Sequence, residues 1–490
     1  MKTKACVGLS MIAAGAMAVD YPIVDTGQIR CYDDRTEIEF PKSGRDWSGQ
    51  DAQYNGNQPS YKDNGDGTVS DLVTGLMWTQ DPGSKKTWDE AVDGAKKCRI
   101  GGYKDWRLPT IKELYSLIDF NGIDPDPRSG TASVPFIDTE VFNFQYGKEE
   151  DGDRIIDSQW ATSNIYESNV MHGMKGMFGV NFADGRIKCY PVSRDRIGRE
   201  KTFYTIYVRD NEKYGQNDFV DNGDGTIIDR ATGLTWMQAD SGEGMDWEEA
   251  LEYAEDMEFA GHNDWRLPNA KELQSIVDYS RCPDTTDSAA IDPVFQCSEI
   301  TNEAGQKDYG HYWSSTTHVG HDGSRAAYIA FGRALGYMQD RRTGQSSWMD
   351  VHGAGAQRSD AKTGDESQLP KGHGPQGDAL RINNMVRLVR GGPAVPVTKG
   401  PKVKKQTITR FVQDRGGSPS RPQGGATGFM EHEDRNNDGK VTRDEFCGPP
   451  GLSEDEKEKQ FKRFDKNGDG VITKDEAPSG PPSGGSEGRR

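Results

Sequence analysis

"GYKDWRLPTIKEL" occupies residues 102–114 of the chain, and "GHNDWRLPNAKEL" occupies residues 261–273. Both stretches place Trp, Arg, Leu and Pro in the same order and end in Lys-Glu-Leu. Agreement over a whole phrase does not arise from composition alone. It predicts that the chain contains two copies of one folded unit.

The match extends to both sides of this phrase. "DNGDGTVSDLVTGLMW" at residues 63–78 and "DNGDGTIIDRATGLTW" at residues 221–236 precede it. In the following "TWDEAVDGAKKC" and "DWEEALEYAEDM", a capping residue has Glu three positions later, which predicts an amphipathic helix. A second helix is expected after each "DWRLP", where apolar residues recur at helical spacing. The residues placed to cap the four helices are Thr87, Thr110, Asp246 and Asn269.

The later part of each copy has β-branched and aromatic residues between glycine turns, as in "GMFGVNFADGRIKCYPV" and "RAAYIAFGRALGYMQ". This composition is typical of strands. "FYTIYVRD" and "NMVRLVRGG" are expected to be the closing strands. Each copy is therefore predicted to be an α+β unit with a hairpin, two helices and a mostly antiparallel sheet, in which the first and last strands are free to pair.

The series "DNGDGT", "TGLMW", "DWRLPT" and "VRLVR" resembles the Lcl C-terminal domain family, a bacterial secreted domain. The resemblance covers both copies, from about Tyr21 to Gly392. It implies a C-type-lectin-like fold, which formylglycine-generating enzymes share, and a role in recognition. It does not supply a reaction, because one fold hosts many functions.

At 490 residues the chain exceeds the size of one hydrophobic core, so several domains are expected. The predicted organisation is a signal peptide at 1–18, two Lcl C-terminal-like domains at 19–212 and 213–392, a flexible linker at 393–427, a small all-α EF-hand pair at 428–478 and a disordered tail at 479–490. With 33% apolar residues and 59 glycines, the two large domains are expected to be rich in loops.

The formal net charge of −18 argues against nucleic-acid partners, because affinity for a phosphate backbone depends on Lys and Arg. Lys2 and Lys4 precede an apolar stretch that ends at Ala18, which is the order of a secretory signal peptide. A buried N-terminal helix is the alternative. No other stretch approaches the ~20 apolar residues that span a bilayer. The protein is therefore expected to be secreted, periplasmic or at the cell surface.

Export makes the cysteines candidates for disulfides. Cys282 and Cys297 bracket one polar loop, so they are the favoured pair, and Cys98 could pair with Cys189. Cys31 and Cys447 have no obvious partner.

Four tryptophan positions recur in both copies, and recurrence at framework positions is typical of buried core anchors with satisfied indole N–H groups. The alternative is contact with a ligand. Arg107 and Arg266 are expected to bind a carboxylate or carbonyl groups within their own copies. The recurring pairs are Trp78 and Trp236, Trp88 and Trp247, Trp106 and Trp265, and Trp160 and Trp313.

Trp47 and Trp348 have no counterpart in the other copy. Trp348 lies in "GYMQDRRTGQSSWMDVHG", residues 336–353, which is interpreted as an inserted loop. A sugar could stack on its aromatic rings and bind its polar groups, so Tyr337, Arg341 and Trp348 are candidate ligand-binding residues. An ordinary solvated loop is the alternative.

Each "DNGDGT" suggests calcium, because the triads Asp63, Asp66, Asp71 and Asp221, Asp224, Asp229 could supply oxygen ligands. Asn-Gly and Asp-Gly are also strong hairpin signals, and no Glu ends a twelve-residue loop, so a turn is favoured. Zinc at the nearby His311, His318 and His321 is not favoured, because no third ligand is placed with the two histidines of the glycine-rich loop.

"DRNNDGKVTRDE" at residues 434–445 and "DKNGDGVITKDE" at residues 465–476 fit the EF-hand loop, which binds Ca²⁺ through oxygen atoms at fixed positions. Val441 and Ile472 are expected to form the β-bridge between paired loops. A dockerin or a metal-free pair is the alternative. The predicted calcium ligands are Asp434, Asn436, Asp438, Lys440 through its carbonyl, Thr442 and Glu445, and Asp465, Asn467, Asp469, Val471 through its carbonyl, Thr473 and Glu476.

These features predict a calcium-binding recognition or adhesion protein outside the cytoplasm, with a glycan, matrix or envelope component as partner and with possible self-assembly. A structural subunit of an extracellular surface assembly is the first alternative. An enzyme of the formylglycine-generating type is less favoured, because that chemistry needs a pair of reactive cysteines in a late strand and no cysteine pair is arranged in this way. No catalytic set is recognisable, so the protein is not expected to be an enzyme.

Overall fold

The structure is a computed structural model that describes residues 19–125, 132–148, 150, 152–193, 200–320, 322–339, 343–399, 408–410, 440–443, 446, 454–473 and 476. The chain forms two compact units, Met1–Gln413 and Asp414–Arg490. The predicted signal peptide at 1–18 and tail at 479–490 lie outside the described residues.

Each copy of the repeat begins with a small four-stranded antiparallel sheet. In the first repeat its order is β11-β6-β5-β4, and in the second it is β12-β13-β14-β22. The closing strand of each repeat pairs with the third strand of its opening meander and not with the first, which lies at the opposite edge, so the predicted pairing of first and last strands is corrected. These strands are β4 (Tyr61–Asp63), β5 (Thr68–Asp71), β6 (Met77–Thr79), β11 (Val208–Arg209), β12 (Phe219–Asp221), β13 (Thr226–Asp229), β14 (Leu234–Met237) and β22 (Val389–Gly391).

The four predicted helices form, and each begins with the capping interaction that its sequence encodes. The helices are α1 (Trp88–Lys97), α2 (Ile111–Ser116), α3 (Trp247–Glu255) and α4 (Ala270–Ser275), and each has a complete capping box with a Glu at its third position. The second helix of each repeat is shorter than its apolar periodicity suggests. The residues after Ser116 and Ser275 continue as turns and bridges.

The main sheet joins the two repeats. Its six strands have the order β17-β18-β21-β10-β9-β8, and β10 pairs with β21 antiparallel through Ile187 and Gln357. The first repeat contributes β8 (Gln159–Trp160), β9 (Gly176–Asn181) and β10 (Arg186–Pro191), and the second contributes β17 (His311–Thr317), β18 (Arg325–Ala330) and β21 (Gln357–Ala361). One sheet and one large apolar cluster therefore extend across both repeats, so the two tandem domains share a core.

The two repeats are related by a pseudo-two-fold axis. β8, β9 and β10 of the first repeat correspond to β17, β18 and β21 of the second. From the β10–β21 junction at the centre of the sheet, equivalent strands therefore follow in the same order toward both edges. The short helices α2 and α4 also meet reciprocally. Lys112 Nζ donates to the Ser275 carbonyl at 2.6 Å, and Lys271 Nζ donates to the Ser116 carbonyl at 2.9 Å. Such an arrangement is the intramolecular equivalent of a symmetric dimer interface.

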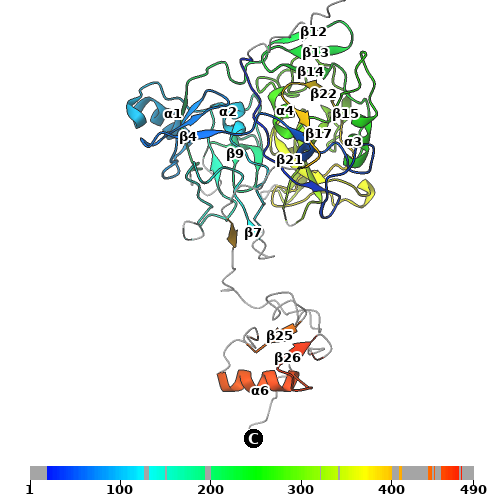
Figure 1. Ribbon diagram of the computed structural model, residues 1–490. Coiled ribbons are helices and arrows are strands. Elements are labelled where there is room, and N and C mark those ends of the chain that lie inside the picture. The colour runs from blue at the N-terminus through cyan, green and yellow to red at the C-terminus, as the bar shows by residue number, and fades with distance from the viewer. Residues whose placement is uncertain are drawn as a thin grey trace, which may run out of the picture. The chain divides into compact units, whose positions relative to one another are not determined.

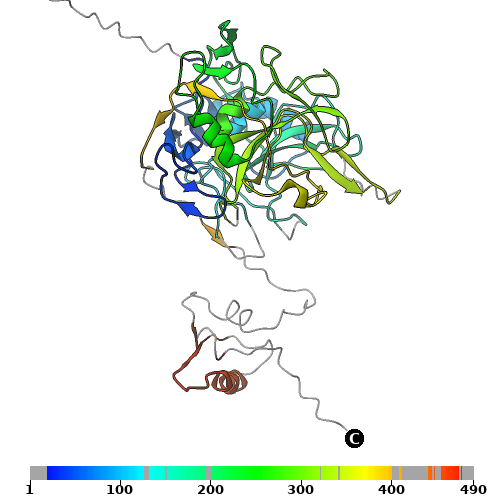
Figure 2. The ribbon, with the colours of Figure 1, turned by 90° about the vertical axis from the view of Figure 1, so that its right-hand side faces the viewer.

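Residues 21–57, which we call the N-terminal strap, precede the first repeat but pack on the second (Figure 1, Figure 2). The Tyr21 N–H donates to the Ala231 carbonyl, and the side chain of Gln28 bonds to both backbone groups of Thr317. The rings of Trp47 and Trp247 lie 6.0 Å apart. The strap contains β1 (Cys31–Tyr32), β2 (Glu37–Ile38), the 3₁₀ turn η1 (Asp51–Gln53) and β3 (Tyr54–Asn55).

The chain after the second repeat returns to the strap and to the first repeat. β23 (Val395–Pro396) pairs with β3, and β24 (Thr409–Arg410) pairs with β7 (Ala132–Ser133). These described parts of the predicted flexible linker at 393–427 thus form backbone ladders with earlier residues. The remaining short elements of this unit, apart from the hairpin described below, are η2 (Ile100–Gly102), β15 (Glu299–Thr301), β16 (Lys307–Tyr309) and η4 (Glu366–Gln368).

The recurring tryptophans lie in the cores of the repeats, but Trp160 and Trp313 are not at equivalent positions, because Trp160 bridges Tyr204 where Tyr312 bridges Met385. Seven of the eight are at most 5% exposed, and Trp88 is half-buried with its indole N–H on the Thr162 carbonyl. Trp78 and Trp236 depart from the prediction, because their buried indole N–H groups have no acceptor among the described residues. Arg107 and Arg266 bind Glu113 and Glu272 of their own repeats through two hydrogen bonds each, as predicted.

The predicted disulfides are absent from the structure, in which Cys31, Cys98, Cys189, Cys282 and Cys297 are all free. Cys98 packs in the cluster around Trp106, whereas Cys189 belongs to the core that the repeats share. Cys282 Sγ lies 3.1 Å from Thr285 Oγ1, and Cys297 Sγ accepts from Arg387. Each thiol therefore has its own packing environment instead of a partner thiol. Cys447 lies outside the described residues.

The described part of the second unit contains β25 (Lys440–Thr442), α6 (Glu454–Phe464) and β26 (Val471–Thr473). β25 and β26 pair antiparallel with Val441 opposite Ile472, which confirms the predicted bridge. These two residues are buried with Phe446 and Phe461, and Phe464 packs against them.

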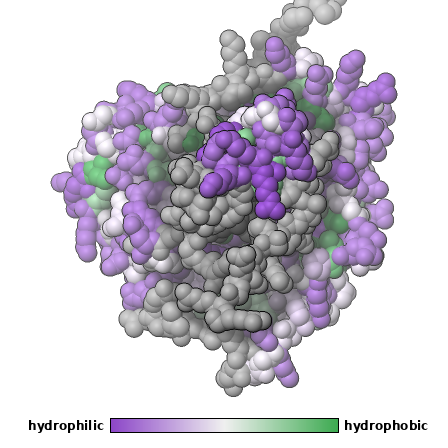
Figure 3. All heavy atoms as spheres, turned by 90° about the horizontal axis from the view of Figure 1, so that it is seen from below, coloured by the Kyte–Doolittle hydropathy of each residue, from purple (hydrophilic) through white to green (hydrophobic). Residues whose placement is uncertain are grey.

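The coloured atoms in Figure 3 are largely hydrophilic, with small separate hydrophobic areas. Few large apolar side chains are exposed in the described part of the protein, and they belong to different segments: Val19, Leu72, Ile100, Val395 and Ile408. In the same part of the chain, no helix combines the length and the apolar character needed to cross a bilayer.

Candidate functional site

The segment that contains Trp348 is a β-hairpin, which corrects its interpretation as a loop. β19 (Leu335–Gln339) pairs antiparallel with β20 (Ser346–Asp350), and Tyr337 lies directly opposite Trp348. Only residues 182–185 separate β9 from β10, whereas residues 331–356 separate the corresponding β18 and β21. The hairpin is therefore an insertion that belongs to the second repeat alone.

Tyr337 and Trp348 form an aromatic pair on this hairpin. Both side chains are half-buried, and their ring centroids lie 5.2 Å apart at an interplanar angle of 57°. Lys371 Nζ lies 4.2 Å from the Tyr337 ring centroid, a cation–π distance. The Tyr337 N–H donates to the Gly377 carbonyl at 2.7 Å, which holds the hairpin to the following segment. The third predicted ligand-binding residue, Arg341, lies outside the described residues.

A buried charge network supports the base of the hairpin. His352 Nε2 lies 2.8 Å from Asp378 Oδ1, and Arg358 also binds Asp378. Burial, followed by the charge of Arg358, lowers the pKa of His352 to about 4. Burial raises the pKa of Asp350 to about 7, and this carboxyl accepts from Tyr166 of the first repeat at 2.8 Å. The hairpin is thus fixed to a rigid base that includes both repeats.

The histidines of the second repeat have structural contacts. His311 stacks on Tyr328 at 4.4 Å, and His318 stacks on Phe136 at 5.3 Å. His318 Nε2 lies 2.8 Å from the Asp184 carbonyl, and burial lowers the pKa of both imidazoles. His321 lies outside the described residues.

The "DNGDGT" segments form the hairpin turns β4–β5 and β12–β13. Asp63 accepts from the Gly65 N–H at 2.8 Å, and Asp66 accepts from the N–H and the hydroxyl of Thr68. Asp221 and Asp224 make the same bonds in the second repeat. These carboxylates satisfy the donors of their own turns, which agrees with the favoured interpretation as turns.

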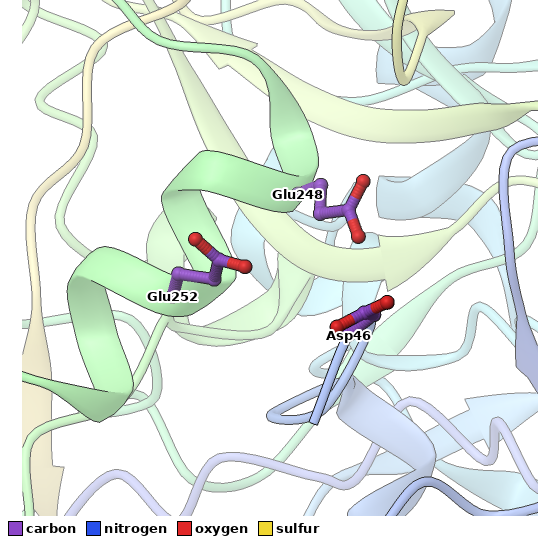
Figure 4. A group of neighbouring side chains, drawn as sticks. All are labelled: Asp46, Glu248 and Glu252. Carbon is purple, nitrogen blue, oxygen red and sulfur yellow. The ribbon is translucent and has the colours of Figure 1, made fainter. Parts of the chain in front are cut away.

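One acidic trio in the described residues has ligand atoms that all lie within 4.8 Å of one another (Figure 4). Glu248 and Glu252 extend from α3 toward Asp46 of the N-terminal strap. Partial burial, followed by the charge of Asp46, raises the pKa of Glu248. The trio follows from the packing of the strap on α3, which no local sequence pattern indicates.

The second predicted calcium loop is described from Asp465 to Thr473 and at Glu476. Asp465 accepts from the Gly468, Asp469 and Gly470 N–H groups at 2.8–3.2 Å, and Glu476 Oε1 accepts from the N–H groups of Lys466 and Asn467 at 3.2 Å. Glu476 Oε2 accepts from Thr473. The final Glu therefore reaches back to the start of the loop. Asn467 and Asp469 of the same loop are exposed, and carboxylate and amide oxygens are the ligand type that Ca²⁺ takes.

The first predicted calcium loop is described at Lys440 and Thr442. These two residues lie at the ends of β25, beside the second loop. The predicted ligands Asp434, Asn436, Asp438 and Glu445 lie outside the described residues.

A cleft of about 650 Å³ lies between the repeats, and no sequence motif indicated it. The start of α2 forms one wall, the segment after α4 forms another, and the connection between the repeats forms the rest. Its lining is polar and aromatic, and includes Lys112, Asn164, Tyr214, Asp278, Tyr279 and Ser280.

The fold and these surfaces define a duplicated, mainly β scaffold that carries an inserted aromatic hairpin and an inter-repeat cleft. The Lcl C-terminal domain model matches residues 67–209 and 225–349, more than half of the chain, and the chain belongs to this family. The two matched regions correspond to the two repeats. No curated protein and no solved structure matches the chain.

Proposed function

We propose that this is a secreted or surface-associated bacterial recognition protein that binds an extracellular partner without turning over a substrate. Family membership supports the location. The observation that carries the recognition role is the paired, half-buried Tyr337 and Trp348 on a hairpin present in one repeat only. Duplicate scaffolds share what folding needs, so an addition to one copy is a natural place for binding.

A neutral glycan or a similar matrix or envelope component is the partner that the hairpin suits best. An aromatic ring presents a flat apolar face to a sugar, and the neighbouring Lys371 can bind a hydroxyl group. The hairpin is held by backbone bonds to residues 377–379, so little order has to be gained on binding.

The second unit is proposed to bind Ca²⁺ through the two loops at residues 434–445 and 465–476. Support comes from the β25–β26 ladder that joins the loops and from the position of the Glu476 carboxylate. Bound Ca²⁺ would cross-link the oxygen atoms of each loop and stabilise this unit, which has a small apolar cluster.

Two buried thiols, Cys31 and Cys189, do not suit the formylglycine-generating alternative. Burial raises the pKa of Cys31 to about 12 and raises the pKa of Cys189 well above its usual range. A nucleophilic cysteine needs the opposite shift, because the thiolate is the reactive species.

A glycan array with the full chain, with and without Ca²⁺, tests the recognition role. Trp348→Ala is expected to lower retention on the glycans that bind by roughly tenfold or more. It should cost only about 1 kcal/mol of stability, the scale of one lost aromatic contact. Leu72→Ala, at an exposed residue far from the hairpin in sequence, is the matched control. Equal retention by both variants, or a loss of several kcal/mol with Trp348→Ala, would assign the hairpin to the scaffold.

A further inference from the structure

The N-terminal strap covers one side of the inter-repeat seam through a compact set of contacts. Thr26 accepts from the Phe120 N–H through its carbonyl at 2.8 Å, and Asp25 accepts from Lys271 Nζ through its carbonyl at 2.9 Å. Gln28 bonds to both backbone groups of Thr317 at 2.7 and 2.9 Å. The strap therefore lies in a groove made by both repeats, with a turn at Gly27.

Gly27 fits this groove because it has no side chain. Its φ is +81°, and a Cβ atom there would lie 2.8 Å from Asp119 Oδ1. Asn121 donates to the Gly27 carbonyl from the other side of the same turn. The groove thus selects a small residue at one position of the segment that it holds.

The pseudo-two-fold axis relates this groove to the open cleft of about 650 Å³. Five residues of the repeats contact strap residues Asp25–Gln28, by hydrogen bonds or, for Asp119, by close approach to Gly27. They are Asp119, Phe120, Asn121, Lys271 and Thr317. The counterparts of Asp119, Phe120, Asn121 and Lys271 in the other repeat are Asp278, Tyr279, Ser280 and Lys112, and all four line the cleft. The cleft is therefore the second copy of a peptide-holding groove.

Tyr279 retains the backbone groups that hold the strap in the other copy. The Phe120 N–H donates to Thr26, and the Phe120 carbonyl accepts from Gln28 at 3.5 Å. The N–H and the carbonyl of Tyr279 make no hydrogen bond with any described residue. Backbone groups without partners at the wall of a cleft are available to an extended chain.

We propose that the inter-repeat cleft binds an extended peptide segment of a partner protein. The segment supplies a backbone carbonyl to the Tyr279 N–H, a donor to the Tyr279 carbonyl and a small residue beside Asp278. The volume is within the range of ligand sites. This surface is separate from the aromatic hairpin, so the inference goes beyond the proposed glycan recognition and does not depend on it.

The strap supplies a probe of known sequence. An acetylated and amidated peptide with the sequence of residues 23–30, "IVDTGQIR", should bind the full chain, whereas the same peptide with Gly27→Leu should bind at least roughly tenfold more weakly. Binding is measured by calorimetry. Hydrogen exchange of the Tyr279 amide is measured in parallel, and it should slow when the first peptide is added.

Ser280→Trp blocks the cleft, because Ser280 is exposed and lies at its wall. This variant should lose peptide binding, whereas Ser367→Trp, at an exposed residue outside the cleft lining, should retain it. Trp348→Ala should also retain it, which separates this proposal from the glycan role. No binding at millimolar peptide, or equal binding by Ser280→Trp without protection of Tyr279, would overturn the proposal.

Discussion

The carboxyl group of Asp51 is buried where the N-terminal strap meets the second repeat, and it accepts from Thr26 at 2.7 Å and from Thr316 at 2.6 Å. Burial, followed by the charge of Asp25, raises its pKa to about 7. The folded protein therefore keeps a proton that the unfolded chain releases near pH 4. The stability from this proton is complete below about pH 4 and is lost as the pH rises through about 7.

We therefore expect the free energy of unfolding of the wild-type protein to fall between about pH 5 and pH 8. In Asp51→Asn this fall should be smaller by on the order of a few kcal/mol. Urea unfolding at the two pH values measures the difference. Asp81→Asn is the control, because Asp81 is exposed. An equal fall in the free energy of unfolding between the two pH values in the wild-type protein and in Asp51→Asn would show that Asp51 does not cause the pH dependence.

The duplicated ion pairs provide a second prediction at the level of single residues. Arg266 and Glu272 are 6% and 4% exposed, whereas Arg107, the counterpart in the first repeat, is 31% exposed. Glu272→Gln leaves a buried guanidinium without its charge partner and should cost about 3–5 kcal/mol. Glu113→Gln should cost clearly less, because water can reach Arg107.

Denaturant unfolding of the two variants tests this comparison. Both Glu residues also complete a helix capping box, so the loss of the cap is the same in each. Equal destabilisation would mean that exposure of the arginine does not set the cost.

Among the secondary-structure elements, the paired loops of the second unit carry the calcium proposal. Glu445→Gln together with Glu476→Gln removes one charge from the last position of each loop and should abolish Ca²⁺ binding at micromolar concentrations. Calorimetric titration of the full chain measures it. Glu39→Gln together with Glu258→Gln, at two exposed residues of the first unit, is the matched control. Unchanged Ca²⁺ binding by the first double variant would refute the ligand assignment.

Elements with local signals could be predicted from the sequence, and elements that depend on distant partners could not. Thr87 and Glu90 lie three residues apart, so the start of α1 is encoded within one turn. The pairing of Tyr337 with Trp348 depends on the register of a hairpin whose tip has no strong turn sequence. The strand β10 is recognisable from its sequence, but β21, with the sequence QRSDA, has no local strand signal and is not predicted. The sequence also does not say whether Ile187 lies at a sheet edge or beside Gln357 of the other repeat.

At the scale of the whole molecule, the shared sheet and core predict that the repeats stay together without a covalent link. A protease site inserted between Glu212 and Lys213, both exposed, allows the connection to be cut after folding. The two fragments should co-elute in size-exclusion chromatography, because the six-stranded sheet and the strap cross the cut. They should separate only in denaturant. Separation in native buffer would show that the seam is weak.

The strap also sets the order in which the protein can be completed. Gln28 bonds to Thr317, 289 residues later in the chain, so the strap has no docking site until the second repeat has been synthesised. At about 5–20 residues per second, that delay is roughly 15 to 60 s. During this time Tyr21, whose N–H donates to the Ala231 carbonyl of the second repeat, has no partner there. Docking of the strap is therefore a late step of folding, because it requires the second repeat to be in place.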